Sequence, residues 1–137
     1  MDRVFLDANV LFSAAYKPDS RLLQLWKLKD AVLCSSRYAL EEARFNLQEN
    51  TQRQALQNLS GVLDLFDAAD RPLPRRLSLP EKDVPIFLAT IKAQANYLLT
   101  GDMQPFGPYF GSKVEGVTIL LPGEYVRLRE RRRQSRG

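Results

Sequence analysis

Residues 4–11, with the sequence VFLDANVL, contain the pattern that decides the fold. Three apolar residues precede Asp7, which predicts a short buried strand that ends at this carboxylate. A helix is expected to follow, from about Val10 to Tyr16, and Asp7 or Asn9 can cap its first turn. The segment therefore predicts a strand that leads directly into a helix, with an acidic residue between them.

The same alternation of strands and helices continues along the chain. Further strands are predicted at 31–34, 62–66, 97–99 and 117–121, and further helices after residue 20, at 36–47, 51–59 and 83–93, and after residue 123. Residues 103–116, rich in glycine and proline, are expected to form one long loop. Because the strands are apolar throughout, they indicate an α/β fold with a parallel sheet covered on both faces.

The composition limits the chemistry that this protein can use. The 137 residues predict one domain, and they include no histidine. This excludes serine–histidine and cysteine–histidine nucleophiles and nearly every catalytic zinc site, so carboxylates remain as catalytic groups. A single cysteine, Cys34, fits a reducing cytoplasm. Neither a signal peptide nor a membrane span is expected, because no apolar run approaches about 20 residues.

The positive charge is concentrated at the C-terminus. Residues 127–137 contain six arginines and one glutamate, a net charge of +5, whereas residues 1–126 have a net charge of −1. The sequence therefore predicts a nearly neutral body, 1–126, and a basic tail, 127–137. Such a tail suggests a phosphate-rich partner, although a solvated end explains the charge equally well.

Several acidic residues occupy positions where a ligand site is expected. Asp7 and Asp102 each follow a predicted strand, and open parallel sheets bind ligands beyond the carboxyl ends of their strands. Asp83 precedes a helix, and Glu41 and Glu42 lie within one. Each acid alone has a simple structural interpretation as a cap, a turn residue or a solvent-facing side chain. Together they could provide the three or four oxygen ligands that a divalent cation needs beside a phosphodiester.

The residues around these acids resemble those of PIN-domain proteins. The resemblance begins with the segment 4–11, in which hydrophobic residues, Asp, any residue and Asn are followed by further hydrophobic residues. Four more segments are similar to later blocks of the family, in the same order: 36–47, 83–90, 98–102 and 116–125. The resemblance covers about residues 2–126. One departure is Pro105, which precedes Phe106 where relatives with this block often have histidine.

The resemblance implies both a fold and an activity. The fold would be a three-layer α/β/α arrangement around a mainly parallel sheet of about five strands, here a PIN-like nuclease domain over 1–126. The activity would be RNA cleavage that depends on Mg²⁺ or Mn²⁺. The alignment selects Glu42 over Glu41, which helical geometry does not separate. The implied residues are the catalytic and metal-binding Asp7, Glu42, Asp83 and Asp102 and the supporting Asn9 and Thr100.

The resemblance also suggests partners. Many small bacterial members are VapC-like toxins that pair with an antitoxin, and homodimers are common, so RNA, an antitoxin and a second copy are expected partners. The candidate RNA-contacting residues are Arg75, Arg76, Arg131, Arg132 and Arg133. The main alternative is a non-catalytic PIN scaffold that binds RNA or an antitoxin. A phosphoaspartate-forming α/β domain is disfavoured, because Asn9 occupies the position of a second acid and Asp7 stands alone.

Overall fold

The computed structural model describes residues 1–136, and the side chains of residues 1–135. Six strands form one sheet, in the order β3-β2-β1-β4-β6-β5. Four of the five neighbouring pairs are parallel, and only β5 and β6 are antiparallel. The strands are β1 (Asp2–Leu6), β2 (Ala31–Ser36), β3 (Asp64–Phe66), β4 (Tyr97–Leu99), β5 (Lys113–Val114) and β6 (Val117–Leu120).

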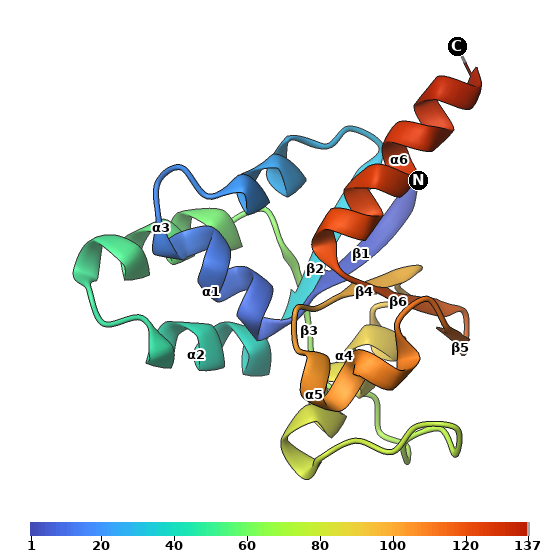
Figure 1. Ribbon diagram of the computed structural model, residues 1–137. Coiled ribbons are helices and arrows are strands. Elements are labelled where there is room, and N and C mark those ends of the chain that lie inside the picture. The colour runs from blue at the N-terminus through green and yellow to red at the C-terminus, as the bar shows by residue number, and fades with distance from the viewer. Residues whose placement is uncertain (137) are drawn as a thin grey trace.

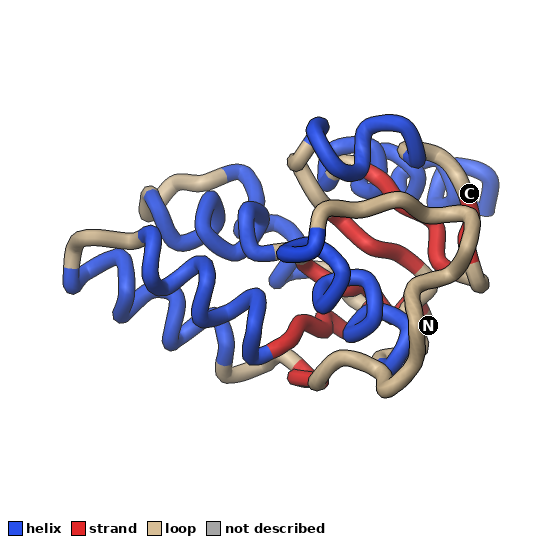
Figure 2. The backbone as a smooth tube through the Cα atoms, turned by 90° about the horizontal axis from the view of Figure 1, so that it is seen from below, coloured by secondary structure: helices blue, strands red, loops and turns tan. Residues whose placement is uncertain are grey.

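Helices connect and cover these strands. The α-helices are α1 (Ala8–Tyr16), α2 (Arg37–Asn46), α3 (Asn50–Ser60), α4 (Val84–Lys92), α5 (Met103–Phe106) and α6 (Pro122–Arg136). Three 3₁₀ turns join them: η1 (Arg21–Lys27), η2 (Glu81–Asp83) and η3 (Gly107–Tyr109). Figure 1 shows α1, α2 and α3 grouped beside the sheet and α6 running alongside β1, and Figure 2 shows the strands lying between helices. No helix in residues 1–136 is long and apolar enough to span a membrane.

The opening apolar run forms the centre of the core. Val4, Phe5 and Leu6 are fully buried, as expected for a strand with neighbours on both sides and helices on both faces. Phe5 is in register with Cys34 of β2 and Leu98 of β4. The carboxyl ends of β1, β2 and β4 therefore meet at one edge of the sheet, and the residues after them are brought together there.

The predicted α/β fold with a mainly parallel sheet is confirmed, with six strands where about five were expected. The prediction of one loop over 103–116 is wrong, because this segment contains α5, η3 and β5. The strands β5 and β6 are joined by Glu115 and Gly116, whose φ angles of 52° and 80° form the tight turn of a hairpin. The segment after residue 20 is a 3₁₀ helix, and β3 is shorter than predicted.

The basic end of the chain continues the last helix of the domain. Helix α6 begins at Pro122 and runs without interruption to Arg136, so the predicted boundary after residue 126 falls inside one helix. Tyr125, in its first turns, is fully buried. The last residue of the predicted tail, 137, lies outside the described residues.

Candidate active site

A pocket of about 390 Å³ lies at the edge of the sheet where β1 and β4 end. Four carboxylates from well-separated segments line it: Asp7, Glu42, Asp83 and Asp102. Helices α1 and α2 form two of its walls, with Phe12 on α1 and Asn46 on α2 among the lining residues. The pocket is therefore acidic and is built from four segments that lie far apart in the sequence.

Asp7 is the most buried acid of the pocket, with 4% of its surface exposed. Its Oδ1 accepts a hydrogen bond of 2.7 Å from the amide of Ala8 and caps α1. Its Oδ2 accepts from the Thr100 hydroxyl at 2.8 Å and from the Asn9 amide at 3.2 Å. Burial raises the pKa of Asp7 to about 6, although the hydrogen bonds from Thr100 and Ala8 oppose this change. Burial therefore disfavours the charged form of the Asp7 carboxylate.

Thr100 and Asn9 join the ends of β1 and β4 to each other. The Thr100 hydroxyl, which is fully buried, accepts hydrogen bonds from the amide of Asp102 at 3.0 Å and from the Asn9 side chain at 3.2 Å. The Asn9 carbonyl oxygen accepts from the amide of Gly101 at 2.8 Å. These bonds fix the backbone that bears Asp102 relative to Asp7.

The remaining two acids approach from other elements. Burial raises the pKa of Glu42, on α2, and that of Asp83, at the end of η2. Lys82 opposes both shifts, whereas the charge of Asp102 adds to both, as expected for carboxylates that face a common space. The Tyr38 hydroxyl donates a 2.8 Å hydrogen bond to the carbonyl of Lys82, which ties η2 to α2.

The pocket has the donor chemistry that a hard divalent cation requires. The charged ligands available are carboxylate oxygens, which suit Mg²⁺ or Mn²⁺. Asp83 is buried, and its Oδ2 has no hydrogen-bond partner among the described residues. Such an unpaired buried oxygen fits a metal ligand. No group of three or more His, Cys, Asp or Glu residues within residues 1–136 is already arranged around a single ion position. The donors fit a cation, and closing around it requires side-chain movement.

A family model matches most of this chain. The sequence model of the PIN domain matches residues 3–104. The chain belongs to the PIN domain family. A comparison with functionally curated proteins finds no significant match.

Two solved structures share the fold of this PIN domain. One is VapBC2 from Rickettsia felis bound to a DNA fragment from their promoter, with a TM-score of 0.61 and 18% identity over 85% of this chain and 96% of that one. The other is FitAcB from Neisseria gonorrhoeae, with a TM-score of 0.53 and 17% identity over 87% of this chain and 97% of that one. At such identities these structures support the fold alone.

The PIN domain brings together in one pocket the four acids that the family resemblance implied. Glu42 lines the pocket and Glu41 does not, so the structure separates two neighbours that helical geometry had left equivalent. Asn9 and Thr100, the predicted supporting residues, both donate hydrogen bonds to Asp7, and their role in function stays a prediction. Metal binding by these acids stays a prediction.

The five arginines proposed to contact RNA do not line this pocket. Arg75 and Arg76 belong to the loop between β3 and η2, where the Arg76 guanidinium donates to the carbonyl of Lys113 at 3.2 Å. Arg131 and Arg133 lie on α6 and line no part of the acidic pocket. Their contact with RNA stays a prediction.

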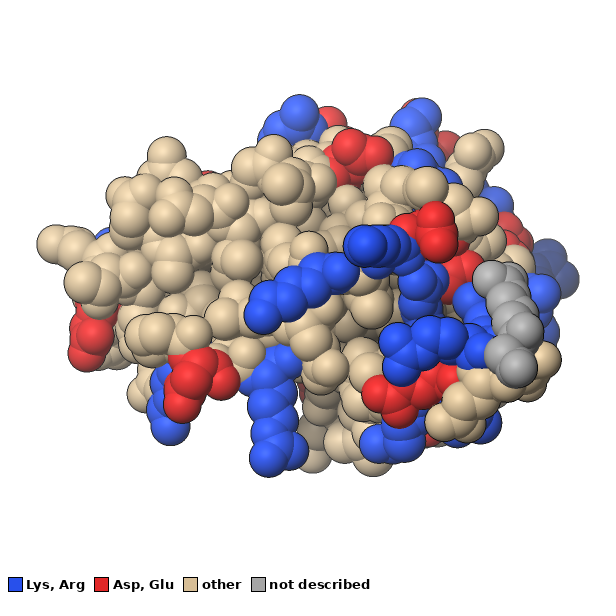
Figure 3. Space-filling model, turned by 90° about the horizontal axis from the view of Figure 1, so that it is seen from above, with Lys and Arg blue, Asp and Glu red and all other residues tan. Residues whose placement is uncertain are grey.

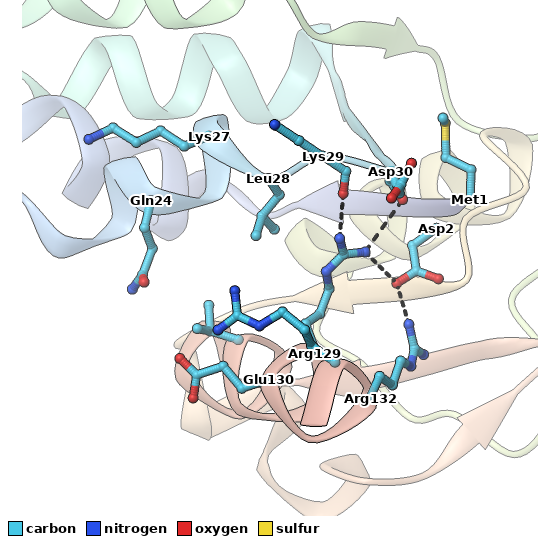
Figure 4. Close-up of a pocket in the computed structure, with 12 residues that line it drawn as sticks. Met1, Asp2, Gln24, Lys27, Leu28, Lys29, Asp30, Arg129, Glu130 and Arg132 are labelled. Atoms are coloured by element: carbon cyan, nitrogen blue, oxygen red, sulfur yellow. Dashed lines mark hydrogen bonds and ion pairs between the residues drawn. The ribbon is translucent and has the colours of Figure 1, made fainter. Parts of the chain in front are cut away.

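Arg132 is engaged within the protein. Its guanidinium donates to Asp2 at 2.8 Å and also to the Tyr97 hydroxyl, and Asp2 further accepts from Tyr125 at 2.7 Å and Arg129 at 3.3 Å. Figure 4 shows Arg129 and Arg132 both directed at Asp2, and Figure 3 shows basic side chains mixed with acidic ones over this end of the molecule. Contact between Arg132 and RNA would have to compete with Asp2.

Two residues near the acids were not predicted from the sequence. Lys82 lines the pocket, and Tyr38 holds its backbone in place. The only sequence signal for Lys82 is its position before Asp83. That signal is weak, because the direction of a side chain in a 3₁₀ turn depends on contacts with a distant helix.

Proposed function

We propose that this PIN domain is a metal-dependent endoribonuclease and the toxin of a type II toxin–antitoxin pair. The observation that carries the proposal is the pocket in which Asp7, Glu42, Asp83 and Asp102 come together from four separate segments. Convergent carboxylates at this edge of the sheet, with one buried oxygen unpaired, are suited to holding a cation beside a phosphodiester.

The four acids would hold Mg²⁺ or Mn²⁺. Such a cation lowers the pKa of bound water and offsets negative charge at the phosphate, which makes hydrolysis to 5′-phosphate and 3′-hydroxyl ends feasible without histidine. The protein's own contribution is orientation. Asp7 is fixed by the amide of Ala8 and the hydroxyl of Thr100, and Asp102 is fixed through its amide on the same hydroxyl. The Asp7 carboxylate and the backbone that bears Asp102 are thus positioned before substrate arrives.

The toxin assignment rests on the family and on the shared fold. The names VapBC2 and FitAcB denote two-component assemblies, and the fold similarity supports a comparable protein partner, an antitoxin, for this chain. A homodimer is expected from the family resemblance and remains part of the proposal.

A cleavage assay with matched variants tests the nuclease proposal. The purified full chain is incubated with a panel of labelled RNAs in Mg²⁺ or Mn²⁺, under single-turnover conditions. Asp102→Asn and Glu42→Gln are expected to lower the cleavage rate at least about 100-fold, because each removes a charged ligand. Glu41→Gln is the control, since Glu41 is the exposed neighbour of Glu42 outside the pocket.

Three results would contradict the proposal. The first is undiminished cleavage in excess EDTA, and the second is wild-type rates in both pocket variants. The third is salt-sensitive RNA binding without products, which would identify a binding scaffold.

A further inference from the structure

Lys82 is the only basic residue among those that line the acidic pocket in the described part of the chain. It belongs to the short turn η2 and is exposed, so its side chain can reach both the pocket and the solvent in front of it. A lysine among four carboxylates has two possible roles. It can pair with one of them, or it can remain available to an incoming anion.

The backbone of Lys82 is held firmly. The Tyr38 hydroxyl donates to its carbonyl oxygen at 2.8 Å, and the amide of Asp83 donates to the carbonyl of Pro80 at 2.9 Å. The first bond holds the turn against α2 and the second closes the turn itself, so together they set the direction in which the Lys82 side chain leaves it. The lysine is therefore positioned by contacts that involve only its main chain.

The ammonium group of Lys82, in contrast, is uncommitted. The ion pairs within 4.0 Å in residues 1–135 involve other basic residues, and no hydrogen bond of the described side chains uses the Lys82 ammonium. Its charge still reaches the acids. Burial raises the pKa of Glu42 and of Asp83, and Lys82 is the main influence that opposes both shifts. The lysine thus lies near these carboxylates without being bound to either.

We infer that the Lys82 ammonium binds a non-bridging phosphate oxygen of the RNA strand that enters the pocket. The inference rests on the proposed nuclease function and adds a substrate-binding residue to it. A phosphodiester must approach four carboxylates, and a cation on the pocket wall reduces the repulsion that it meets. Three donors on a flexible stem allow the ammonium to follow the phosphate as the reaction proceeds.

This role predicts that removing the Lys82 charge weakens RNA binding and strengthens metal binding. Lys82→Met removes the charge but keeps the length and apolar stem of the side chain. Cleavage and RNA binding should weaken, because the phosphate loses a charged partner. Mn²⁺ binding to the RNA-free protein should become several-fold tighter, because a positive charge beside the carboxylates is gone. A residue that merely maintained the structure would weaken both.

The experiment compares Lys82→Met, Lys82→Arg and Lys92→Met with wild type. Lys92 is an exposed lysine at the far end of α4 and outside the pocket, so its substitution is the matched control. Single-turnover cleavage of single-stranded RNA gives the rate and half-saturation, and electron paramagnetic resonance of free Mn²⁺ gives metal affinity. Lys82→Met should cleave about 10- to 100-fold more slowly, Lys82→Arg should keep most of the activity, and Lys92→Met should match wild type.

The outcomes separate this inference from the function on which it rests. The inference is wrong if Lys82→Met cleaves RNA within twofold of the wild-type rate, or if it loses affinity for both RNA and Mn²⁺. Neither result contradicts the proposed nuclease function. If wild type cleaves no RNA, the proposed function fails, and Lys82 is then judged by RNA binding. Equal RNA affinity of wild type and Lys82→Met, including no affinity in either, overturns the inference in that case too.

Discussion

Asp7 is expected to make the metal-free protein less stable as the pH rises from 4 to 7. Burial raises its pKa from the ordinary value of 3.8 to about 6 in the folded protein. Between these values the folded state binds more protons than the unfolded state, so the free energy of unfolding falls with increasing pH. The loss begins near pH 4 and is complete above about pH 6.

The size of this effect follows from the shift in the pKa. A difference of about 2 units corresponds to about 3 kcal/mol, at 1.36 kcal/mol per unit. The full value applies because the Asp7 carboxyl is almost wholly shielded from solvent. Since urea lowers the stability of a small domain by about 1–3 kcal/mol per molar, the unfolding midpoint should fall by roughly 1–3 M.

The assay measures urea unfolding of wild type and Asp7→Asn in EDTA at pH 4, 5, 6 and 7. The fluorescence of Trp26, the only tryptophan, reports unfolding, because its indole is partly buried and donates to the carbonyl of Leu59. At pH 4 the difference between the two proteins reflects the hydrogen bonds that asparagine alters. The change in that difference up to pH 7 reports the ionisation of Asp7 together with its repulsion of Asp83 and Glu42, since the other titrating groups are shared.

A difference that stays constant from pH 4 to pH 7 would refute the reasoning. It would mean that Asp7 titrates alike in the folded and unfolded protein. A difference that changes in favour of wild type would mean that the hydrogen bonds from Thr100 and Ala8 outweigh burial and lower the pKa instead.

Three further predictions concern Asp83, Thr100 and Asp2. At pH 7, Mn²⁺ at about 100 times its dissociation constant should stabilise wild type against thermal unfolding by about 2.7 kcal/mol. Asp83→Asn should lose most of this stabilisation, because the unpaired oxygen of Asp83 is an expected ligand. Equal stabilisation of both proteins would argue against Asp83 as a ligand. Thr100→Val should cost about 1–3 kcal/mol and at least tenfold in cleavage, because it leaves buried partners unpaired, whereas Thr100→Ser should behave like wild type in both assays. Asp2→Asn should lower the free energy of unfolding by about 1–3 kcal/mol at pH 7, because α6 loses charged hydrogen bonds. Burial alone would raise the pKa of Asp2, but these bonds lower it, so the cost of the substitution should vanish as the pH falls below about 4. A cost that does not change with pH would contradict this account.

Much of the fold could be predicted because the central strands have a strong signal. The run 4–6 is wholly apolar and ends in an acid, so both the buried strand and the edge at which its carboxylate lies follow from it. The positions of Asp7 and Asp102 beyond parallel strands follow in the same way, since the strands that precede them are neighbours in the sheet. These features depend on the apolar pattern of the strands, which a sequence displays directly.

The features that the sequence did not predict depend on contacts between distant segments of the chain. The hairpin of β5 and β6 contains only two residues on one side and turns at Glu115 and Gly116, a pair with little local signal. The six arginines at the C-terminus suggested a basic tail that meets a phosphate-rich partner or solvent. In the structure, Arg129 and Arg132 bind Asp2, which lies more than 120 residues away in the sequence. The sequence shows which charged residues are present but does not show which of them pair in the folded protein.

The capping and functional interpretations of Asp7 turn out to be compatible, because its two oxygens are used differently. Oδ1 satisfies the amide at the start of α1, and Oδ2 meets the side chains that join β1 to β4. The cap thus occupies one oxygen and restricts the orientation of the carboxylate that lines the pocket. Asp83 shows the complementary case: it begins α4 without a side-chain capping bond, and one of its buried oxygens has no partner among the described residues. An acid at a helix start that does not cap the helix is a stronger sign of a ligand than one that does, since only the unpaired oxygen still requires a cation or a proton.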